Sequence, residues 1–159
     1  MLVLASMAPL PSVFSVGGRL GYIDDGDRPK IVTSRFEYED SYTLERSHAT
    51  GGYEGLKRAL AKAPNEVHDE VRGATVLGRG GAGFPAGVKW GLMPADKYPR
   101  YLVVNGDESE PGTYKDRLLM ERDPHQLIEG CLIAAYAAGL AQVFLYIRRE
   151  MPLAHERVG

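Results

Sequence analysis

The stretch DPHQLIEGCLIAAYAAGLAQVFLYIR, residues 123–148, decides the fold, because it carries a helix and a strand with clear boundaries. Asp123 is a favourable N-cap, Pro124 stands at the first helical position, and Gln126 follows three residues after the cap. The pattern predicts a helix that runs to about Ala138, where Gly139 can end it in the left-handed conformation. The predicted buried face of this helix comprises Leu127, Ile128, Cys131, Leu132 and Ala135.

Two apolar runs flank this helix and predict strands. YLVVN at 101–105 and QVFLYIR at 142–148 are short and rich in β-branched and aromatic residues, as buried strands are. A strand, a helix and a second strand in this order form a right-handed crossover with parallel strands. The sequence therefore predicts an α/β fold, with function at the carboxyl ends of the strands, where NGDESEP follows the first one.

The first part of the chain is less regular. Residues 1–50 are predicted to be an irregular N-terminal segment with turns, as in VGGRLGYIDDGDRP, and residues 51–159 to form the main domain. YEGLKRALAK predicts a helix over about 53–62, and NEVHDEV predicts a second short helix with Asn65 as its N-cap. ATVL, residues 74–77, is a candidate short strand.

Composition argues against several classes of function. The chain has 19 basic and 21 acidic residues, so no overall positive charge favours nucleic acid. The longest apolar run, CLIAAYAAGLA, is too short to cross a membrane. The single cysteine, Cys131, allows neither an intramolecular disulfide nor a four-cysteine iron–sulfur cluster, and we expect it to be a buried core residue. We expect His125 to form a local hydrogen bond at the start of its helix.

The segment GRGGAGFP, residues 78–85, satisfies the dinucleotide-binding pattern G-x-G-x-x-G through Gly78, Gly80 and Gly83. Asp107 lies 24 positions beyond the last glycine, near the offset that the pattern expects. A regular helix after the loop is not expected, because one proline and several glycines follow it. Three interpretations stay open: a Rossmann NAD site, another site where glycine N–H groups approach a planar or anionic ligand, and a flexible loop.

An acidic cluster follows the first predicted strand, in NGDESEPGTYKDR. It comprises Asn105, Asp107, Glu108 and Glu110. Such a cluster is either a solvated turn, with Lys115 and Arg117 as counter-charges, or a group that hydrogen-bonds ribose and amide groups. A metal site is disfavoured, because no second acidic cluster stands at ligand spacing.

Several motifs in order resemble the flavin-binding, NADH-oxidising subunit of respiratory complex I. They are GRGGAGFPAGVKW, YLVVNGDESEPGTYKD, DPHQLIEGCLIAAYAAG and YIRRE. The same family includes the diaphorase subunits of NAD-linked formate dehydrogenases and bidirectional hydrogenases. The resemblance begins near TSRFEYEDSYTLE and GGYEGLKRAL and covers most of the chain.

The resemblance implies an incomplete Rossmann-like domain that holds FMN in its glycine loop and NADH beside the flavin. The residues that it places around FMN are Gly78, Arg79, Gly80, Lys89, Asn105, Asp107 and Glu108. Phe84 and Glu110 would face the nicotinamide nucleotide. Because the flavin carries the hydride chemistry, no catalytic side chain is expected.

The resemblance also implies partners and a location. These are a thioredoxin-like [2Fe–2S] subunit and other peripheral-arm subunits, at the cytoplasmic face of a bacterial membrane. Family members continue with a ubiquitin-like domain and a helical domain that holds a [4Fe–4S] cluster, whose four cysteine ligands are not among these 159 residues. We therefore expect an N-terminal part, or a truncated relative, of an FMN-dependent NADH dehydrogenase (quinone) subunit.

Some positions depart from the family pattern. Leu77 replaces a usual arginine, Leu92 an aromatic residue that helps to hold the nucleotide, and Gly106 a usual alanine. Two other classes stay open. One is a binding or assembly module that no longer holds flavin, and the other is a complete NAD-binding enzyme in which Asp107 binds ribose.

Overall fold

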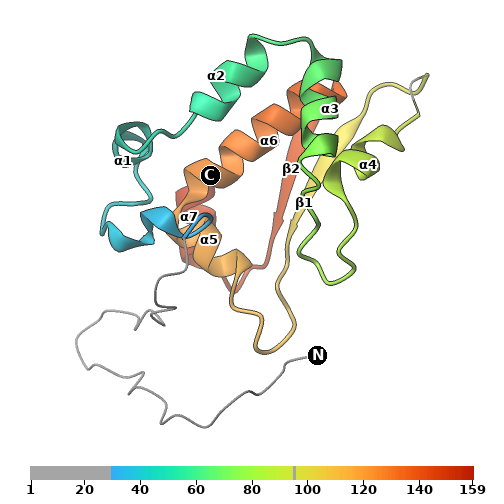
Figure 1. Ribbon diagram of the computed structural model, residues 1–159. Helices are drawn as coiled ribbons and strands as arrows, with labels where there is room; N and C mark the ends of the chain where they lie inside the picture. The colour runs from blue at the N-terminus through green and yellow to red at the C-terminus, as the bar shows by residue number, and fades with distance from the viewer. Residues whose placement is uncertain (1–29, 95) are drawn as a thin grey trace, which may run out of the picture. The chain divides into compact units, whose positions relative to one another are not determined.

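The structure is a computed structural model that describes residues 30–94 and 96–159 (Figure 1). The turns predicted in VGGRLGYIDDGDRP lie outside the described residues. Every helix and strand named below belongs to the compact unit Val32–Gly159. The domain boundary expected at residue 50 stays a prediction.

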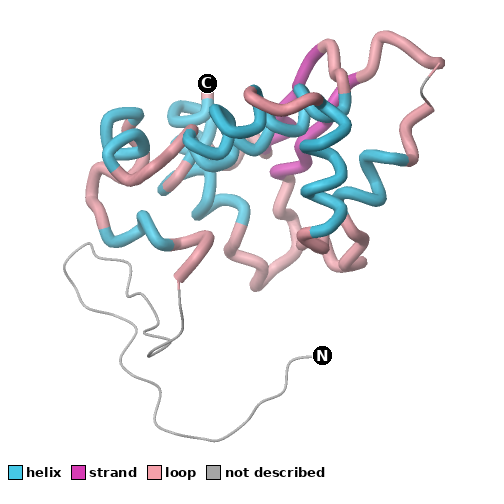
Figure 2. Tube along the Cα trace, turned by 45° about the horizontal axis from the view of Figure 1, so that its top comes forward, coloured by secondary structure: helices cyan, strands magenta, loops and turns pink. Residues whose placement is uncertain are grey.

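Two parallel strands form the sheet, β1 (Tyr101–Gly106) and β2 (Gln142–Ile147). The connection between them contains the helices α5 (Asp116–Arg122) and α6 (Pro124–Ala138). Figure 2 shows these two short strands beside a larger helical part. The predicted α/β fold with a parallel crossover is confirmed, and α5 is an element that sequence analysis missed.

The long helix α6 begins and ends as its sequence predicts. The Asp123 carboxylate accepts a hydrogen bond from the Gln126 N–H at 3.2 Å, which satisfies one of the free donors of the first turn. Gly139 ends the helix in the left-handed conformation with φ of 59°, where the absence of a Cβ removes the steric cost.

The strands are more exposed than predicted. Val103 is 65% exposed and Tyr146 is 61% exposed, whereas Leu102 and Val104 on β1 are half-buried. Because side chains alternate along a strand, the exposed residues of β1 share one face of the sheet. That face is open to solvent within the described part of the chain, so the prediction of two buried strands was wrong.

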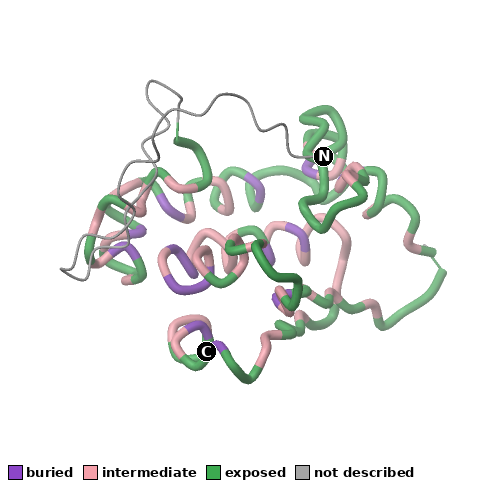
Figure 3. The backbone as a smooth tube through the Cα atoms, turned by 90° about the horizontal axis from the view of Figure 1, so that it is seen from below, coloured by how far each residue is buried: buried purple, intermediate pink, exposed green. Residues whose placement is uncertain are grey.

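Helix α6 also departs from the prediction at one position. Leu132 is 42% exposed, although Cys131 beside it is buried. The helix is apolar on most of its circumference, so hydrophobic periodicity alone did not locate its solvent side. Figure 3 shows that the buried stretches gather mainly in the helices.

The segment before the sheet is mostly helical. A short 3₁₀ helix covers Ser34–Glu37, and α1 covers Leu44–Ala49, within a segment that sequence analysis expected to be irregular. Two further helices follow, α2 (Glu54–Leu60) and α3 (Pro64–Gly73). The predicted N-cap of α3 was wrong by two residues. Ala63 is the N-cap, Pro64 occupies the favourable first position, and the Glu66 carboxylate accepts the Ala63 N–H at 2.7 Å.

A glutamate of α6 anchors α2. The Glu129 carboxylate accepts hydrogen bonds from the N–H groups of Tyr53 at 2.8 Å and Leu56 at 3.0 Å. These N–H groups lie at the start of α2, where no intrahelical acceptor is available. A half-buried side chain of one helix thus completes the first turn of another.

A six-residue helix, α4 (Ala86–Gly91), follows the glycine-rich loop. Sequence analysis did not expect a regular helix there, and that expectation was wrong. Pro85 precedes the helix as its N-cap and therefore costs no helical hydrogen bond. A Cβ at Gly87 would lie 2.5 Å from Cα of Arg72, so only glycine lets α4 approach the backbone of α3 this closely.

An ion pair joins the segment before α1 to the start of α6. Nη1 of Arg35 lies 3.0 Å from Oδ2 of Asp123, and Nε of Arg35 donates to the Thr50 hydroxyl at 2.8 Å. Asp123 is 1% exposed, and Arg35 places an opposite charge beside its buried carboxylate.

A small apolar core lies where α5, α6 and α7 (Pro152–Val158) meet. Its buried members are Met120, Met151 and Ala154, packed against Leu127, Ile147 and Val158. This core holds α5 beside the carboxyl ends of the strands.

We predict opposite effects on stability for two glycine substitutions. Gly87→Ala forces a Cβ against the backbone of α3 and should lower the free energy of unfolding by about 1–3 kcal/mol. Gly130→Ala places its Cβ in open space on α6 and should raise that free energy by about 0.5–1 kcal/mol. Urea unfolding measures the change in the free energy of unfolding for both variants. Equal changes would contradict the close contact between α4 and α3.

The Arg35–Asp123 pair generates a second prediction. Asp123→Ala leaves the Arg35 guanidinium without its carboxylate and removes the helix cap, so unfolding should become easier by about 3–5 kcal/mol. Asp123→Asn retains a capping oxygen and should cost less than Asp123→Ala. Thermal melting, monitored by circular dichroism, compares the stability of the two variants. If the two variants had the same melting temperature, the capping oxygen would contribute nothing to stability.

Candidate functional site

The glycine-rich loop is closed at its base by backbone hydrogen bonds. The Gly78 N–H donates to the carbonyl oxygen of Phe84 at 2.9 Å, and the Ala86 N–H donates to that of Val76 at 2.8 Å. Leu77 and Pro85 form an isolated antiparallel bridge, so ATVL contributes a bridge residue rather than a strand. The loop therefore has a defined base while its tip projects from the domain.

The tip of the loop is an open backbone surface. No heavy atom lies within 4 Å of the position that a Cβ would take at Gly80, Gly81 or Gly83. Gly81 has φ of 116° and Gly83 has φ of 65°, conformations that favour glycine. Backbone N–H groups in such a loop can approach a phosphate or a flat ring closely. The loop therefore fits the flavin nucleotide that the resemblance implies.

Three side chains that the resemblance assigns to the two nucleotides lie in or beside this loop and are exposed. Arg79 lies within the loop and Lys89 lies on α4, so both side chains present a positive charge to solvent. The Phe84 residue is 47% exposed, which leaves a flat apolar surface for contact with a second ring. These contacts stay predictions.

The acidic cluster lies at the carboxyl end of β1, where the sequence places it. Asn105 Oδ1 accepts the Asp107 N–H at 3.0 Å, and the Asp107 carboxylate accepts the Ser109 hydroxyl. Figure 1 shows this loop and the glycine-rich loop at the same end of the domain. The two loops that carry most of the predicted site residues thus lie at the same end of the domain, and the exposed Glu110 belongs to the loop after β1.

Glu108 has a different environment from its neighbours. Its carboxylate accepts backbone N–H groups of Lys115, Asp116 and Arg117, at 2.5, 2.7 and 2.9 Å. Burial by itself raises the pKa of Glu108, but these three donors outweigh it, so the pKa lies below its usual value. Glu108 therefore stays ionised and caps α5.

The expected counter-charges form their closest ion pairs within α5. The Lys115 ammonium pairs with Asp116, and Nε of Arg117 lies 2.7 Å from Glu121. Both side chains also interact electrostatically with Glu108, so they offset part of the charge of the acidic cluster, as the sequence predicts. Their backbone N–H groups contact Glu108 directly. The run KDRLLMER, with its acidic first turn, is the sequence signal by which α5 could be recognised.

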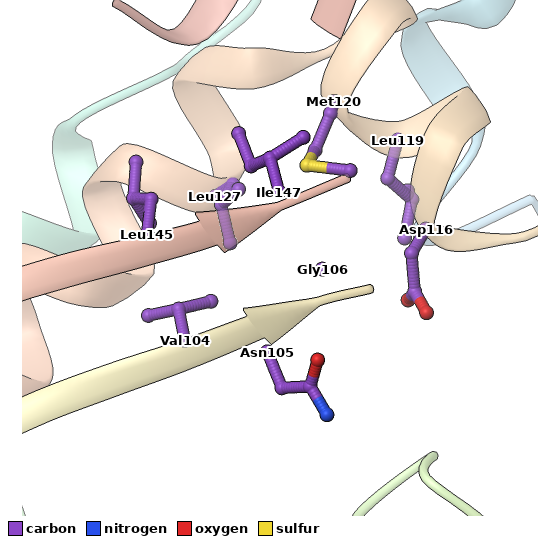
Figure 4. A pocket seen from close by; sticks show the side chains of 9 residues that line it. All are labelled: Val104, Asn105, Gly106, Asp116, Leu119, Met120, Leu127, Leu145 and Ile147. Atoms are coloured by element: carbon purple, nitrogen blue, oxygen red, sulfur yellow. The ribbon is translucent and has the colours of Figure 1, made fainter. Parts of the chain in front are cut away.

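A cavity of about 80 Å³ lies between the strand ends and α5 (Figure 4). Its lining is mainly apolar and includes Leu119, Met120 and Ile147, together with the polar side chains of Asn105 and Asp116. Ligand pockets usually measure about 300–1,000 Å³. The cavity is therefore too small to enclose a flavin.

Cys131 is buried, as the sequence predicts. The local hydrogen bond expected for His125 was wrong, because its partner comes from the start of α2, 72 residues away in the sequence. Burial raises the pKa of the Cys131 thiol, which makes it a poor nucleophile. Nδ1 of His125 lies 2.8 Å from the Tyr53 hydroxyl. No group of three or more His, Cys, Asp or Glu side chains is arranged for a metal ion among the described residues. Within residues 30–94 and 96–159, no helix is long and apolar enough to cross a membrane.

The fold defines the class: an incomplete α/β domain with a glycine-rich loop before its first strand. A family model described as the Nuo51 FMN-binding domain matches residues 71–159. The chain belongs to this family, the complex I 51 kDa family. The resemblance inferred from the motifs is confirmed.

Named relatives agree. An NADH-quinone oxidoreductase subunit of Rhizobium meliloti is 45% identical over 130 residues, covering 80% of this chain and 31% of the relative. An NADH-quinone oxidoreductase subunit of Aquifex aeolicus is 51% identical over 111 residues, covering 70% of this chain and 26% of the relative. The match therefore spans less than a third of the length of these relatives.

A solved structure is similar as well. It is an NAD⁺-reducing [NiFe]-hydrogenase in the H₂-reduced state, with a TM-score of 0.52 and 40% identity. The match covers 60% of this chain and 18% of that chain. The domain thus resembles proteins of two kinds of redox complex.

The environment of His125 predicts that acid lowers stability. Burial lowers the pKa of His125 below its usual value of about 6.5. As the pH falls through about 6.5, the unfolded chain takes up this proton before the folded chain does, so the free energy of unfolding decreases. Urea unfolding at about pH 7.5 and about pH 5.5, on either side of this value, measures the effect. His125→Asn should reduce the difference between the two conditions, and an unchanged difference would assign it to other groups.

Proposed function

We propose that this chain binds FMN at the edge formed by the glycine-rich loop and the carboxyl end of β1. The observation that carries the proposal is the open tip of the loop around Gly80, where no protein atom occupies the space beside the backbone. Membership of a family described by its FMN-binding domain supports the same ligand.

The roles proposed for the residues follow their chemistry. Arg79 and Lys89 would offset the negative charge of the phosphate, and the N–H groups around Gly78 and Gly80 would approach the nucleotide closely. Asn105 and Asp107 would hydrogen-bond sugar or ring amide groups from the strand end. Phe84 and Glu110 would contact the nicotinamide nucleotide.

The proposed activity is hydride transfer from NADH to FMN within a larger NADH:quinone oxidoreductase. FMN, when bound, supplies the hydride-accepting chemistry. This chain would bind both nucleotides, place their rings against each other and exclude water from between them. Electrons would then pass to iron–sulfur centres outside these residues, such as those of a thioredoxin-like [2Fe–2S] subunit. That assembly would lie at the cytoplasmic face of the membrane.

A second candidate is a non-catalytic part of such a complex, or of a hydrogenase or formate dehydrogenase. The observation that favours it is the open face of the sheet, because Val103 is 65% exposed where a parallel sheet is usually covered on both faces. In that case the fold would form but would hold FMN only with residues that other segments supply.

FMN titration of the purified chain distinguishes the two candidates. Saturable quenching of flavin fluorescence, weakened about tenfold in Lys89→Ala, would support a site contained in these residues. NADH would then be added to the complex without oxygen, and loss of flavin absorbance would demonstrate hydride transfer. Absence of binding would favour the non-catalytic candidate.

Gly80→Val tests the position of the site. The new side chain enters open space, so the fold should remain intact while FMN affinity falls by about tenfold or more. Circular dichroism checks the fold, and the same titration measures affinity. Wild-type affinity in this variant would exclude the tip of the loop from the binding site.

A further inference from the structure

Glu108 is the best-connected side chain of the acidic loop. Oε1 accepts the N–H groups of Lys115 and Asp116, and Oε2 accepts that of Arg117. These N–H groups lie at the start of α5, where helical geometry provides no acceptor. Lys115 is the N-cap of α5 and makes no capping bond with its own side chain, so Glu108 supplies the cap from seven residues upstream.

The backbone of the loop is shaped for this contact. Glu108 has φ of 40° and Tyr114 has φ of 46°, a left-handed conformation that side-chain-bearing residues rarely adopt. Gly112 between them has φ of 84°. These turns reverse the chain, so that the residue after Asp107 meets the start of α5. The three bonds to Glu108 offset the strain of the conformation.

The contact between Glu108 and α5 also holds the residues at the carboxyl end of β1. Asn105 and Asp107 are joined by the hydrogen bond between Asn105 Oδ1 and the Asp107 N–H, and Glu108 follows directly. Helix α5 is in turn held by Met120, which is 3% exposed in the apolar core. A chain of contacts therefore runs from the core through α5 and Glu108 to the two residues that would face the flavin.

We propose that Glu108 is a positioning residue. This inference rests on the proposed function, in which this edge of the domain binds FMN. Its carboxylate fastens the loop 107–115 to α5 and so orients Asn105 and Asp107 toward the cofactor. This role differs from the direct contact with FMN that the resemblance implies. Glu108 acts on the flavin through its neighbours.

The test uses two variants of the full chain. Glu108→Asn suits the left-handed backbone, since asparagine is enriched there, but its side chain is too short to reach α5. Glu108→Gln retains the length and one acceptor oxygen. Amide hydrogen exchange of Lys115, Asp116 and Arg117 is measured by NMR without flavin, and FMN affinity is then measured well below the melting temperature.

We expect exchange at these three amides to accelerate by about tenfold or more in Glu108→Asn, while α6 amides keep their rates. FMN affinity should fall by a similar factor, and Glu108→Gln should recover part of both losses. The matched control is Glu66→Ala, which removes a carboxylate from the Ala63 N–H at the start of α3. It should lower the melting temperature without changing either readout.

Three results would overturn the proposal. Unchanged exchange at the three amides would show that Glu108 does not hold the loop. Faster exchange with wild-type FMN affinity would show that the fastening does not position the flavin site. An equal loss of FMN affinity in Glu66→Ala would show that lower overall stability, rather than the contact of Glu108, explains the loss. Failure of the proposed function is recognised separately, because the wild-type chain would then bind no FMN while the exchange measurement still reports on the loop.

Discussion

The structure depends on the interactions of one buried carboxylate, that of Asp123. One side chain caps the central helix α6 and neutralises Arg35, which comes from the segment before α1. Helix α6 then carries Glu129, which completes the first turn of α2, and connects the two strands of the sheet. The early helices and the sheet are thus joined through a single helix whose start is fixed by one buried charge.

Two close contacts, α4 against α3 and the loop after β1 against α5, hold the loops of the proposed site. Gly87 brings α4 against the backbone of α3, which fixes the residues that follow the glycine-rich loop. Glu108 brings the loop after β1 against α5. In both cases a loop is tied at its base, while its outer surface keeps backbone and charged groups accessible. Such an arrangement suits the proposed nucleotide site, because a site for flavin chemistry positions rings and phosphates rather than supplying a nucleophile.

The sheet differs from that of a complete doubly wound domain. A parallel sheet is usually covered on both faces, yet Val103 and Tyr146 lie exposed here. The relatives in the family are more than three times as long as the matched segment. The edge with the site residues, in contrast, is built from contacts within the described part of the chain, through Glu108 and the base of the glycine-rich loop.

Local signals determined much of this protein. Asp123, Pro124 and Gly139 specify the boundaries of α6 because caps act within one turn of the chain, and the glycine and acidic motifs revealed the family because their spacing is local too. Tertiary structure alone decided the partners of Asp123, Glu129 and Glu108, the helix after Pro85 and the exposed side of Leu132. Those outcomes depend on which segments meet in space, and neither hydrophobic periodicity nor residue spacing encodes the identity of a distant neighbour.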